Sequence, residues 1–119
     1  MNGGEATFRS DLGRGPTAIS VVSIASDVLR LYGFNLESVE ADLVQTDWRY
    51  LEGGSVRDRA TVRIRSRGSD YFVGSLRVEV EGVRDGGGWA SLPVTNRLRD
   101  EYGEIRSDVR ERLRPYMTQ

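Results

Sequence analysis

Five arginines at alternate positions between residues 57 and 67 form the part of this sequence best suited to binding chemistry. Thr61 takes the one place in this series that is not arginine. Alternate side chains of a β-strand point to the same face, so the segment predicts a strand with one arginine-lined side. The members are Arg57, Arg59, Arg63, Arg65 and Arg67. Guanidinium groups bind carboxylates and phosphates as planar forks, which makes this side a candidate ligand-binding face.

Aromatic side chains accompany the arginines. Gly53-Gly54 is a two-residue hairpin signal, and pairing across it places Trp48 beside Arg59, with Tyr50 and Tyr71 expected nearby. Trp, Tyr and Arg dominate interaction hot spots, and arginines with aromatics are also typical of nucleic-acid platforms. The predicted partner-binding residues are Trp48, Tyr50, Arg59, Arg63 and Arg65.

Acidic residues in the flanking strands give the arginines an alternative, structural role. A three-residue loop at 68–70 keeps the polar faces of the two longest strands matched. Cross-strand ion pairs contribute roughly 0.2–1 kcal/mol each. The pairings predicted from the two turns are Arg59 with Glu79, Arg57 with Glu81, Leu43 with Ile64, Asp42 with Arg65, and Glu40 with Arg67. This arrangement favours neutralisation within the sheet, and ligand binding stays open beside it.

The composition excludes several kinds of chemistry. The chain has no cysteine and no histidine, and all 17 of its basic residues are arginine. Zinc, haem and copper sites lose their usual ligands, and Ser-His, Cys-His and Schiff-base chemistry cannot be built. The remaining acid–base candidates are the strand carboxylates Asp42, Asp47, Glu79 and Glu81. Glycosidase chemistry also needs a cleft and a raised pKa, so we predict no catalytic residue, no metal and no cofactor.

Charge and hydropathy point to a protein partner. The net charge of −1 and the pI of about 5.5 argue against non-specific electrostatic binding to nucleic acid or to an anionic membrane. No segment approaches the ~18 apolar residues of a membrane span. The start, Met1-Asn2-Gly3-Gly4, has no signal-peptide pattern. It fits a native cytoplasmic start or a chain cut after a removed leader, and both remain open.

The elements that position these residues form one α+β domain. A length of 119 residues predicts a single domain, with a flexible segment over 1–15 and the folded part over 16–119. Apolar spacing predicts helices over 17–32 and 96–114, the second stopped by Pro115. Alternation predicts strands over 39–51, 56–66 and 71–83, with a short strand at 6–9. The expected architecture is a two-layer sandwich, in which two amphipathic helices cover one face of a three- or four-stranded antiparallel meander.

Two short segments resemble the small lipoprotein domains of bacterial outer-membrane assembly. Leu29-Arg30-Leu31-Tyr32-Gly33-Phe34 reads as a helix that ends in Gly-Phe, and Gln45-Thr46-Asp47-Trp48-Arg49 lies in a strand before an arginine-rich strand. The order helix, long meander, helix is similar to the lipoprotein subunit of the β-barrel assembly machinery and to the lipopolysaccharide-assembly lipoprotein. The resemblance covers residues 17–84, and the lipid-bearing cysteine of those proteins is absent here.

The resemblance implies a non-catalytic scaffold that docks to a larger envelope complex, with a periplasmic or cell-envelope location favoured over the cytoplasm. Any membrane association would come through a lost lipid anchor or through the partner. We therefore predict a non-enzymatic interaction module, an accessory subunit that binds a protein partner. A nucleic-acid-binding domain that uses the arginine and aromatic face is the first alternative. A small enzyme that depends on carboxylates is the second.

Overall fold

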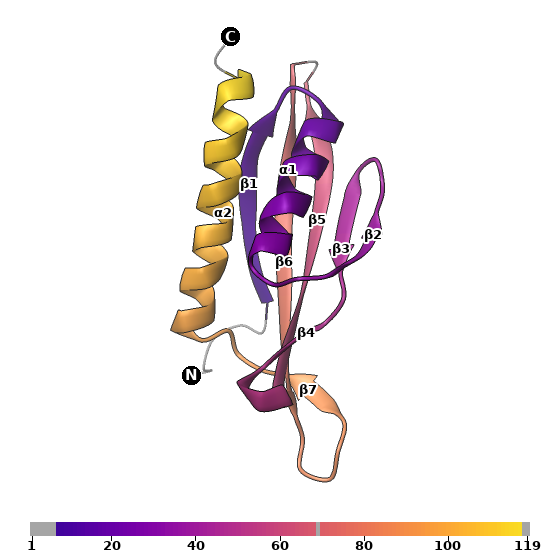
Figure 1. Ribbon diagram of the computed structural model, residues 1–119, viewed down its shortest axis with the longest axis vertical. Coiled ribbons are helices and arrows are strands. Elements are labelled where there is room, and N and C mark those ends of the chain that lie inside the picture. The colour runs from indigo at the N-terminus through magenta and orange to yellow at the C-terminus, as the bar shows by residue number, and fades with distance from the viewer. Residues whose placement is uncertain (1–6, 69, 118–119) are drawn as a thin grey trace.

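The computed structural model describes residues 7–68 and 70–117, and it has two helices packed on one face of an antiparallel sheet (Figure 1). Its elements in chain order are β1 (Thr7–Gly15), α1 (Ala18–Leu31), β2 (Leu36–Val39), β3 (Leu43–Thr46), β4 (Arg49–Leu51), the 3-10 turn η1 (Glu52–Gly54), β5 (Val56–Arg67), β6 (Tyr71–Val83), β7 (Trp89–Ser91) and α2 (Asn96–Met117). The strands lie in the order β1-β6-β5-β3-β2, while β4 also pairs with β5 and β7 with β6. The predicted α+β sandwich is confirmed, and short strands extend its meander.

The two longest strands, β5 and β6, carry the arginine face. Their hairpin has the predicted register, with Arg59 opposite Glu79 and Arg57 opposite Glu81. Alternate residues of β5 are buried, from Asp58 to Ile64, while the arginines between them point to the other side. The period-two pattern and the short loop therefore determine this part of the sheet.

The segment predicted as one strand over 39–51 is divided into β3 and β4. At the break the side chain of Thr46 stands in for a main-chain acceptor, because its Oγ1 accepts the Ala60 N–H (2.9 Å). The chain then leaves the sheet at Asp47 and Trp48 and rejoins it at Arg49.

The break shifts the register by one residue. β4 pairs with β5 as the glycine turn predicts, with Arg49 opposite Asp58. Leu43 in β3 instead lies opposite Arg63, so the predicted pairing of Leu43 with Ile64 is wrong. The other pairings predicted for this side, Asp42 with Arg65 and Glu40 with Arg67, are wrong for the same reason. Asp42 and Glu40 lie in the turn between β2 and β3, where the Glu40 N–H donates to the Leu43 carbonyl at 2.7 Å.

The first helix matches its prediction closely. Thr17 caps the helix through its side chain, which accepts the Ser20 N–H at 3.1 Å, and the Ser20 hydroxyl accepts the Thr17 N–H in return. Such a reciprocal box satisfies two otherwise unpaired backbone donors. Gly33 (φ +92) ends the helix, and Phe34 is buried beyond it, with its N–H donating to the Leu29 carbonyl.

The second helix is longer than predicted. The apolar stripe is buried, with Tyr102, Ile105, Val109 and Leu113 as its members. Pro115 lies inside the helix, which continues to Met117, so the prediction that it stops the helix is wrong. Proline removes one N–H donor and crowds the preceding turn. Both effects cost least in a terminal turn, where few intrahelical bonds remain to be lost.

The N-terminal strand is also longer than predicted. β1 runs from Thr7 to Gly15 and pairs with β6, which makes residues 7–15 part of the sheet rather than of a flexible segment. Residues 1–6 lie outside the described part of the chain. Phe8 and Leu12 point to the core, where Phe8 packs on Tyr102 with ring centroids 5.4 Å apart.

Gly103 offers a direct test of how strongly α2 forms. A Cβ added there would meet no atom within 4 Å, and glycine costs a helix interior about 1 kcal/mol relative to alanine. We expect Gly103→Ala to raise the free energy of unfolding by roughly 0.5–1 kcal/mol, measured by urea denaturation. Gly74→Ala is the matched control. Its Cβ would lie 2.9 Å from Val21 Cγ1 in the core, so that variant should lose stability. Equal effects of the two substitutions would contradict the expectation.

Candidate functional site

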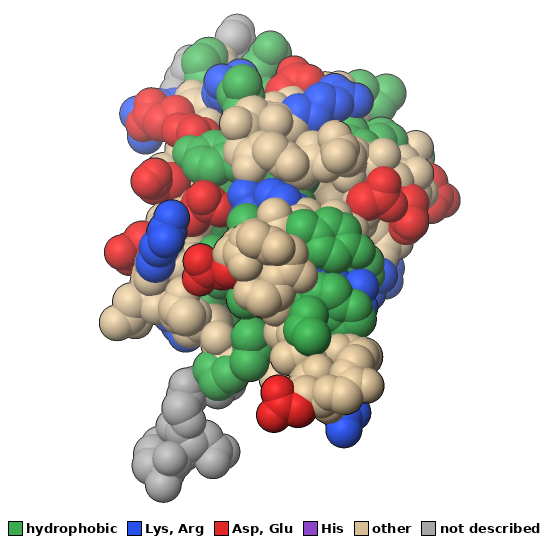
Figure 2. Space-filling view, turned by 60° about the horizontal axis from the view of Figure 1, so that its bottom comes forward, with side chains coloured by type: hydrophobic (Ala, Val, Ile, Leu, Met, Phe, Trp, Pro, Cys, Tyr) green, Lys and Arg blue, Asp and Glu red, His purple; other side chains and the backbone are tan. Residues whose placement is uncertain are grey.

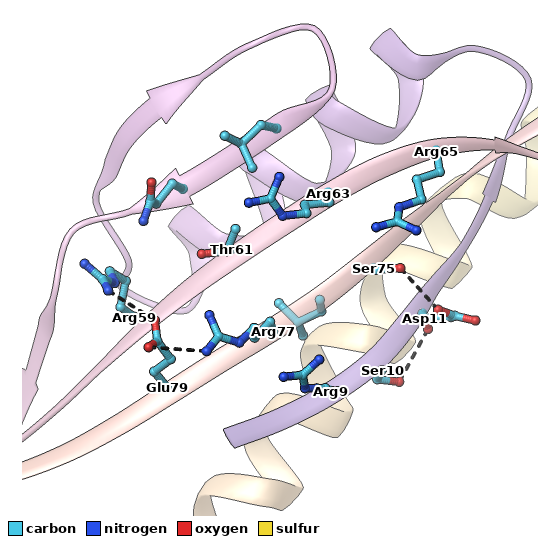
Figure 3. Close-up of a pocket in the computed structure, with 13 residues that line it drawn as sticks. Arg9, Ser10, Asp11, Arg59, Thr61, Arg63, Arg65, Ser75, Arg77 and Glu79 are labelled. Carbon is cyan, nitrogen blue, oxygen red and sulfur yellow. Dashed lines mark hydrogen bonds and ion pairs between the residues drawn. The ribbon is translucent and has the colours of Figure 1, made fainter. Parts of the chain in front are cut away.

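A concavity of about 760 Å³ lies on the face of the sheet opposite the helices (Figure 3). Side chains from β1, β3, β5 and β6 line it. The polar members are Arg9, Ser10, Asp11, Gln45, Arg59, Thr61, Arg63, Arg65, Ser75, Arg77 and Glu79. We call this concavity the arginine groove.

The groove carries an excess of positive charge, with five arginines against two carboxylates, Asp11 and Glu79. Glu79 accepts ion pairs from Arg59 (3.1 Å) and Arg77 (3.6 Å). The other three arginines, Arg9, Arg63 and Arg65, are exposed. None of these three has an ion pair among residues 7–68 and 70–117.

The register shift in β3 explains this excess. The predicted neutralisation holds on the β6 side, where Glu79 and Glu81 pair with Arg59 and Arg57. On the β3 side it fails, because Leu43 and Gln45 line the groove, whereas Asp42, the carboxylate expected opposite Arg65, does not. The predicted neutralisation is therefore wrong for Arg65 and Arg67. Arg63, for which the predicted register offered no carboxylate, also has no ion pair in the described part of the chain.

Aromatic rings and arginines form a separate cluster where β4 and β7 flank β5 and β6. Arg57 Cζ lies 4.1 Å from the ring centroids of both Trp48 and Trp89, and Arg59 Cζ lies 4.4 Å from that of Trp48. Tyr50 packs edge-on against Trp89 at 5.9 Å. Burial works against the charged form of Arg57, but hydrogen bonds to Glu81 at 2.9 and 2.6 Å outweigh this and raise its pKa. We call these residues the Trp–Arg cluster.

The predicted partner-binding residues divide between these two places. Arg63 and Arg65 line the groove, and Trp48 and Tyr50 belong to the Trp–Arg cluster. Arg59 belongs to both places. The predicted neighbourhood of Trp48 and Arg59 is confirmed. Tyr71 lies at the other end of β5, because it pairs with Arg67.

Hydrophobic side chains gather at the end of the molecule where β4 and β7 lie, which comes forward in Figure 2. Tyr50 is 57% exposed and Val83 is 53% exposed there, while Leu92 is 36% exposed. Apolar atoms make up a large share of the surface of any folded protein. These residues therefore do not define a second site by themselves.

A buried ionic cluster was missed from the sequence. Asp58 is fully buried and accepts two hydrogen bonds from Arg49, at 2.9 and 2.6 Å, and one from the Tyr102 hydroxyl at 2.6 Å. Arg49 also bonds Glu101 (2.6 Å) and the Tyr32 carbonyl (2.6 Å). The cluster joins β4, β5 and α2, and Arg49 ties it to the end of α1.

Proton affinities in this cluster follow from burial and pairing. Burial lowers the pKa of Arg49, but its hydrogen bonds to Asp58 and Glu101 and the charge of both carboxylates outweigh this and raise it. Burial and the Asp58 carboxylate raise the pKa of Tyr102 far above its usual range. Both Asp58 oxygens are engaged, and the groups around it hold their protons firmly. The cluster is built to hold elements together rather than to move a proton. The signal in the sequence is the position of Asp58, which falls on the same face of its strand as the apolar residues Ala60 and Val62 and not on the face of the arginines.

The described residues hold no group of three or more Asp, Glu, His or Cys side chains that could bind a metal ion. Neither helix in the described part of the chain combines the length and apolar character that a membrane crossing requires.

No family model matches the chain, and comparison with curated proteins finds no relative. The crystal structure of the protein DR_A0006 from Deinococcus radiodurans is similar over 90% of this chain and 98% of that one, with 13% sequence identity and a TM-score of 0.43. A likeness at that score carries no argument about function, so the groove has to be interpreted from its own chemistry.

Proposed function

We propose that this protein is a non-catalytic interaction module that binds an acidic segment of a partner protein in the arginine groove, as an accessory subunit of a larger complex. One observation carries the proposal: Arg9, Arg63 and Arg65 are exposed in a concavity and have no carboxylate partner in the described part of the chain. Guanidinium groups match carboxylates in shape and charge. An acidic ligand is therefore the natural complement of this surface.

The uncharged polar side chains of the groove support a peptide as the ligand. Gln45 and Thr61 stand beside the arginines, and both can donate and accept hydrogen bonds. Ser75 donates to Asp11 Oδ1 at 3.4 Å and keeps acceptor capacity. Such groups can satisfy the amides of a bound backbone while the arginines hold its carboxylates.

The same geometry speaks against catalysis in the groove. Its two carboxylates are already engaged, Glu79 by two arginines and Asp11 by Ser75. General acid–base chemistry needs a group whose pKa is tuned near the working pH, and nucleophilic catalysis needs a nucleophile beside a base. The groove offers arginines, hydroxyls and an amide around those two acids, which suits binding better than bond-making.

Nucleic acid is the main competitor for the same charge. Proteins that bind single strands combine a basic groove with aromatic faces on which bases stack. Here Trp48 and Trp89 pack against Arg57, and Trp48 also against Arg59. Because these ring faces already pack against arginines, they are not free to stack on bases, and a protein ligand suits the groove better than a nucleic acid does. The envelope setting follows from the sequence resemblance alone, and it stays a prediction.

Charge reversal in the groove tests the proposal. We expect the double variant Arg63→Glu/Arg65→Glu to lose a stoichiometric protein partner that the tagged wild-type protein retains from its native host after nuclease treatment. Partners would be identified by mass spectrometry, with membrane and soluble fractions kept separate. Arg97→Glu/Arg99→Glu makes the same charge change at exposed positions of α2, behind the sheet, and should keep the partner. A partner that survives reversal in the groove, or a yield of nucleic acid alone, would refute the proposal.

A further inference from the structure

We infer that the ligand of the arginine groove is an extended acidic peptide that continues into a second basic concavity. This inference rests on the proposed function and names the form of its ligand. The second concavity measures about 660 Å³ and lies where β1, the β5–β6 hairpin and the end of α2 meet. Its polar members are Asp11, Arg14, Arg67, Tyr71, Arg110 and Arg114. Asp11 lines both concavities, so they adjoin and form what we call the basic track.

The track concentrates most of the positive charge of the chain. It holds nine of the 17 arginines but only two of the 18 carboxylates, Asp11 and Glu79. The whole chain carries a net charge of −1, so the remaining surface is strongly acidic. Such segregation focuses a positive field along one surface and steers ligands of opposite charge to it. A single small anion would use only part of this field.

A β-bulge in β1 brings one of the nine arginines to the track. Asp11 pairs with Ser75 and Arg14 with Val73, so three residues of β1 advance against two of β6. The extra residue shifts the alternation by one and turns Arg14 to the same side as Asp11. In a regular strand Arg14 would have pointed to the helical layer. Bulges re-aim side chains in this way, often beside functional sites.

The length of the track sets the length of the ligand. Arg59 and Arg67 lie eight residues apart on β5, which corresponds to roughly 26 Å at about 3.3 Å per residue. An extended peptide has the same rise and the same two-residue repeat. Carboxylates at alternate positions can therefore meet successive arginines of β5. A peptide of about ten residues or more is needed to reach both concavities.

Stacking geometry again favours a peptide over a nucleic acid. The aromatic ring inside the track is that of Tyr71, and Arg14 Cζ lies 5.0 Å from its centroid. The rings beyond the other end, Trp48 and Trp89, pack against Arg57. The track thus offers charge without an open stacking platform, which suits carboxylates better than bases.

Asp11 makes the inference specific. Its carboxylate stands where the two concavities adjoin and accepts a hydrogen bond from Ser75, while its carbonyl accepts one from Arg110 at 3.1 Å. A long acidic ligand must pass this negative charge, whereas a short one can avoid it. Removing the charge should therefore strengthen the binding of a long ligand in particular.

The test uses fluorescein-labelled oligoglutamate peptides of about four and about twelve residues, with binding to the full chain followed by fluorescence anisotropy. We expect the longer peptide to bind at least about tenfold more tightly, because its second half binds at high effective concentration. Binding of the longer peptide should become weaker in two double variants, Arg63→Glu/Arg65→Glu and Arg67→Glu/Arg114→Glu. It should not change in the control variant Arg97→Glu/Arg99→Glu. The Asp11→Asn substitution should increase the affinity for the longer peptide more than the affinity for the shorter one.

The outcomes separate the two proposals. If neither peptide binds, or reversal at Arg63 and Arg65 has no effect, the proposed function fails. The peptides could bind through Arg63 and Arg65 with an affinity that depends neither on peptide length nor on Arg67 and Arg114. That result would support the proposed function and refute the extended ligand. A twelve-nucleotide oligothymidylate that displaces the longer peptide at lower concentration than unlabelled peptide does would overturn the choice of a peptide.

Discussion

Replacing Asp58 with alanine should lower the free energy of unfolding by about 3–5 kcal/mol, the usual cost of removing one partner from a buried ion pair. Asp58 is fully buried, and the Arg49 side chain is 10% exposed. The substitution removes three hydrogen bonds, two from Arg49 and one from Tyr102. Native domains are stable by about 5–15 kcal/mol in total. This one change is therefore expected to threaten the folded state.

The loss arises because Arg49 would be left as an unbalanced buried charge. Glu101 would remain as its carboxylate partner, but its side chain is 37% exposed, and solvent weakens that pair. The ring of Phe34, 4.1 Å from Arg49 Cζ, cannot replace a carboxylate. Buried polar groups without partners cost far more than the pairs themselves contribute.

Chemical denaturation measures this effect, and the chain contains a matched control. Asp27 also pairs with an arginine, Arg30, but 61% of its side chain is exposed. Asp27→Ala should therefore change the stability by less than about 1 kcal/mol. Tyr102→Phe removes one hydrogen bond to Asp58 and should cost about 1.5–3 kcal/mol. An Asp58→Ala protein as stable as the Asp27→Ala protein would refute the structural role of the cluster.

Stability is expected to fall steeply above pH 10, because two tyrosines hold their protons more tightly in the folded chain. Burial and Asp58 raise the pKa of Tyr102 far above its ordinary value of 10.0. A hydrogen bond to Asp108 (2.6 Å), burial and nearby carboxylates raise the pKa of Tyr32 to about 12. Above pH 10 the unfolded chain releases protons that the folded chain keeps, so the equilibrium moves toward the unfolded state.

The sign and the pH window follow from this linkage. A raised pKa contributes stability that is fully present below pH 10, the ordinary tyrosine pKa, and is lost as pH rises toward the folded value. Each tyrosine that stays protonated costs up to about 1.4 kcal/mol per pH unit. For Tyr32 the loss of stability with pH ends near pH 12. Solvent screening makes the contribution of Tyr32 to this loss smaller than that of Tyr102. For Tyr102 the loss continues through the accessible alkaline range.

Urea denaturation at several pH values from 8 to 11.5, with tyrosinate absorbance followed in parallel, measures the expected loss. Tyr102→Phe should be less stable than the wild type at pH 8 but should lose stability more slowly above pH 10. Tyr32→Phe should flatten the curve to a smaller degree. Parallel curves for the wild type and Tyr102→Phe would show that Tyr102 ionises as readily in the folded chain as in the unfolded one.

The parts of the fold that follow from local patterns were predictable. The period of two in β5 and β6, together with the short loop at 68–70, determined which residues face each other, down to Arg59 opposite Glu79. The limits of α1 (Ala18–Leu31) lie one residue inside the predicted 17–32, and the structure adds Thr17 as the cap at its start, with Gly33 beyond its end. In these cases neighbours in the sequence supply the geometry, through alternation, capping and turn chemistry.

The candidate site was only half predictable. Its arginines and their common face follow from alternation within β5, and this much the sequence determined by itself. Tertiary structure decided which arginines lack an acidic partner, because the break at residues 47–48 shifts the pairing of β3 with β5 by one residue. It also brought Asp58 to Arg49 and Tyr102, and a bulge in β1 turned Arg14 onto the track. These arrangements depend on contacts between segments far apart in the chain, and local periodicity carries no information about such contacts.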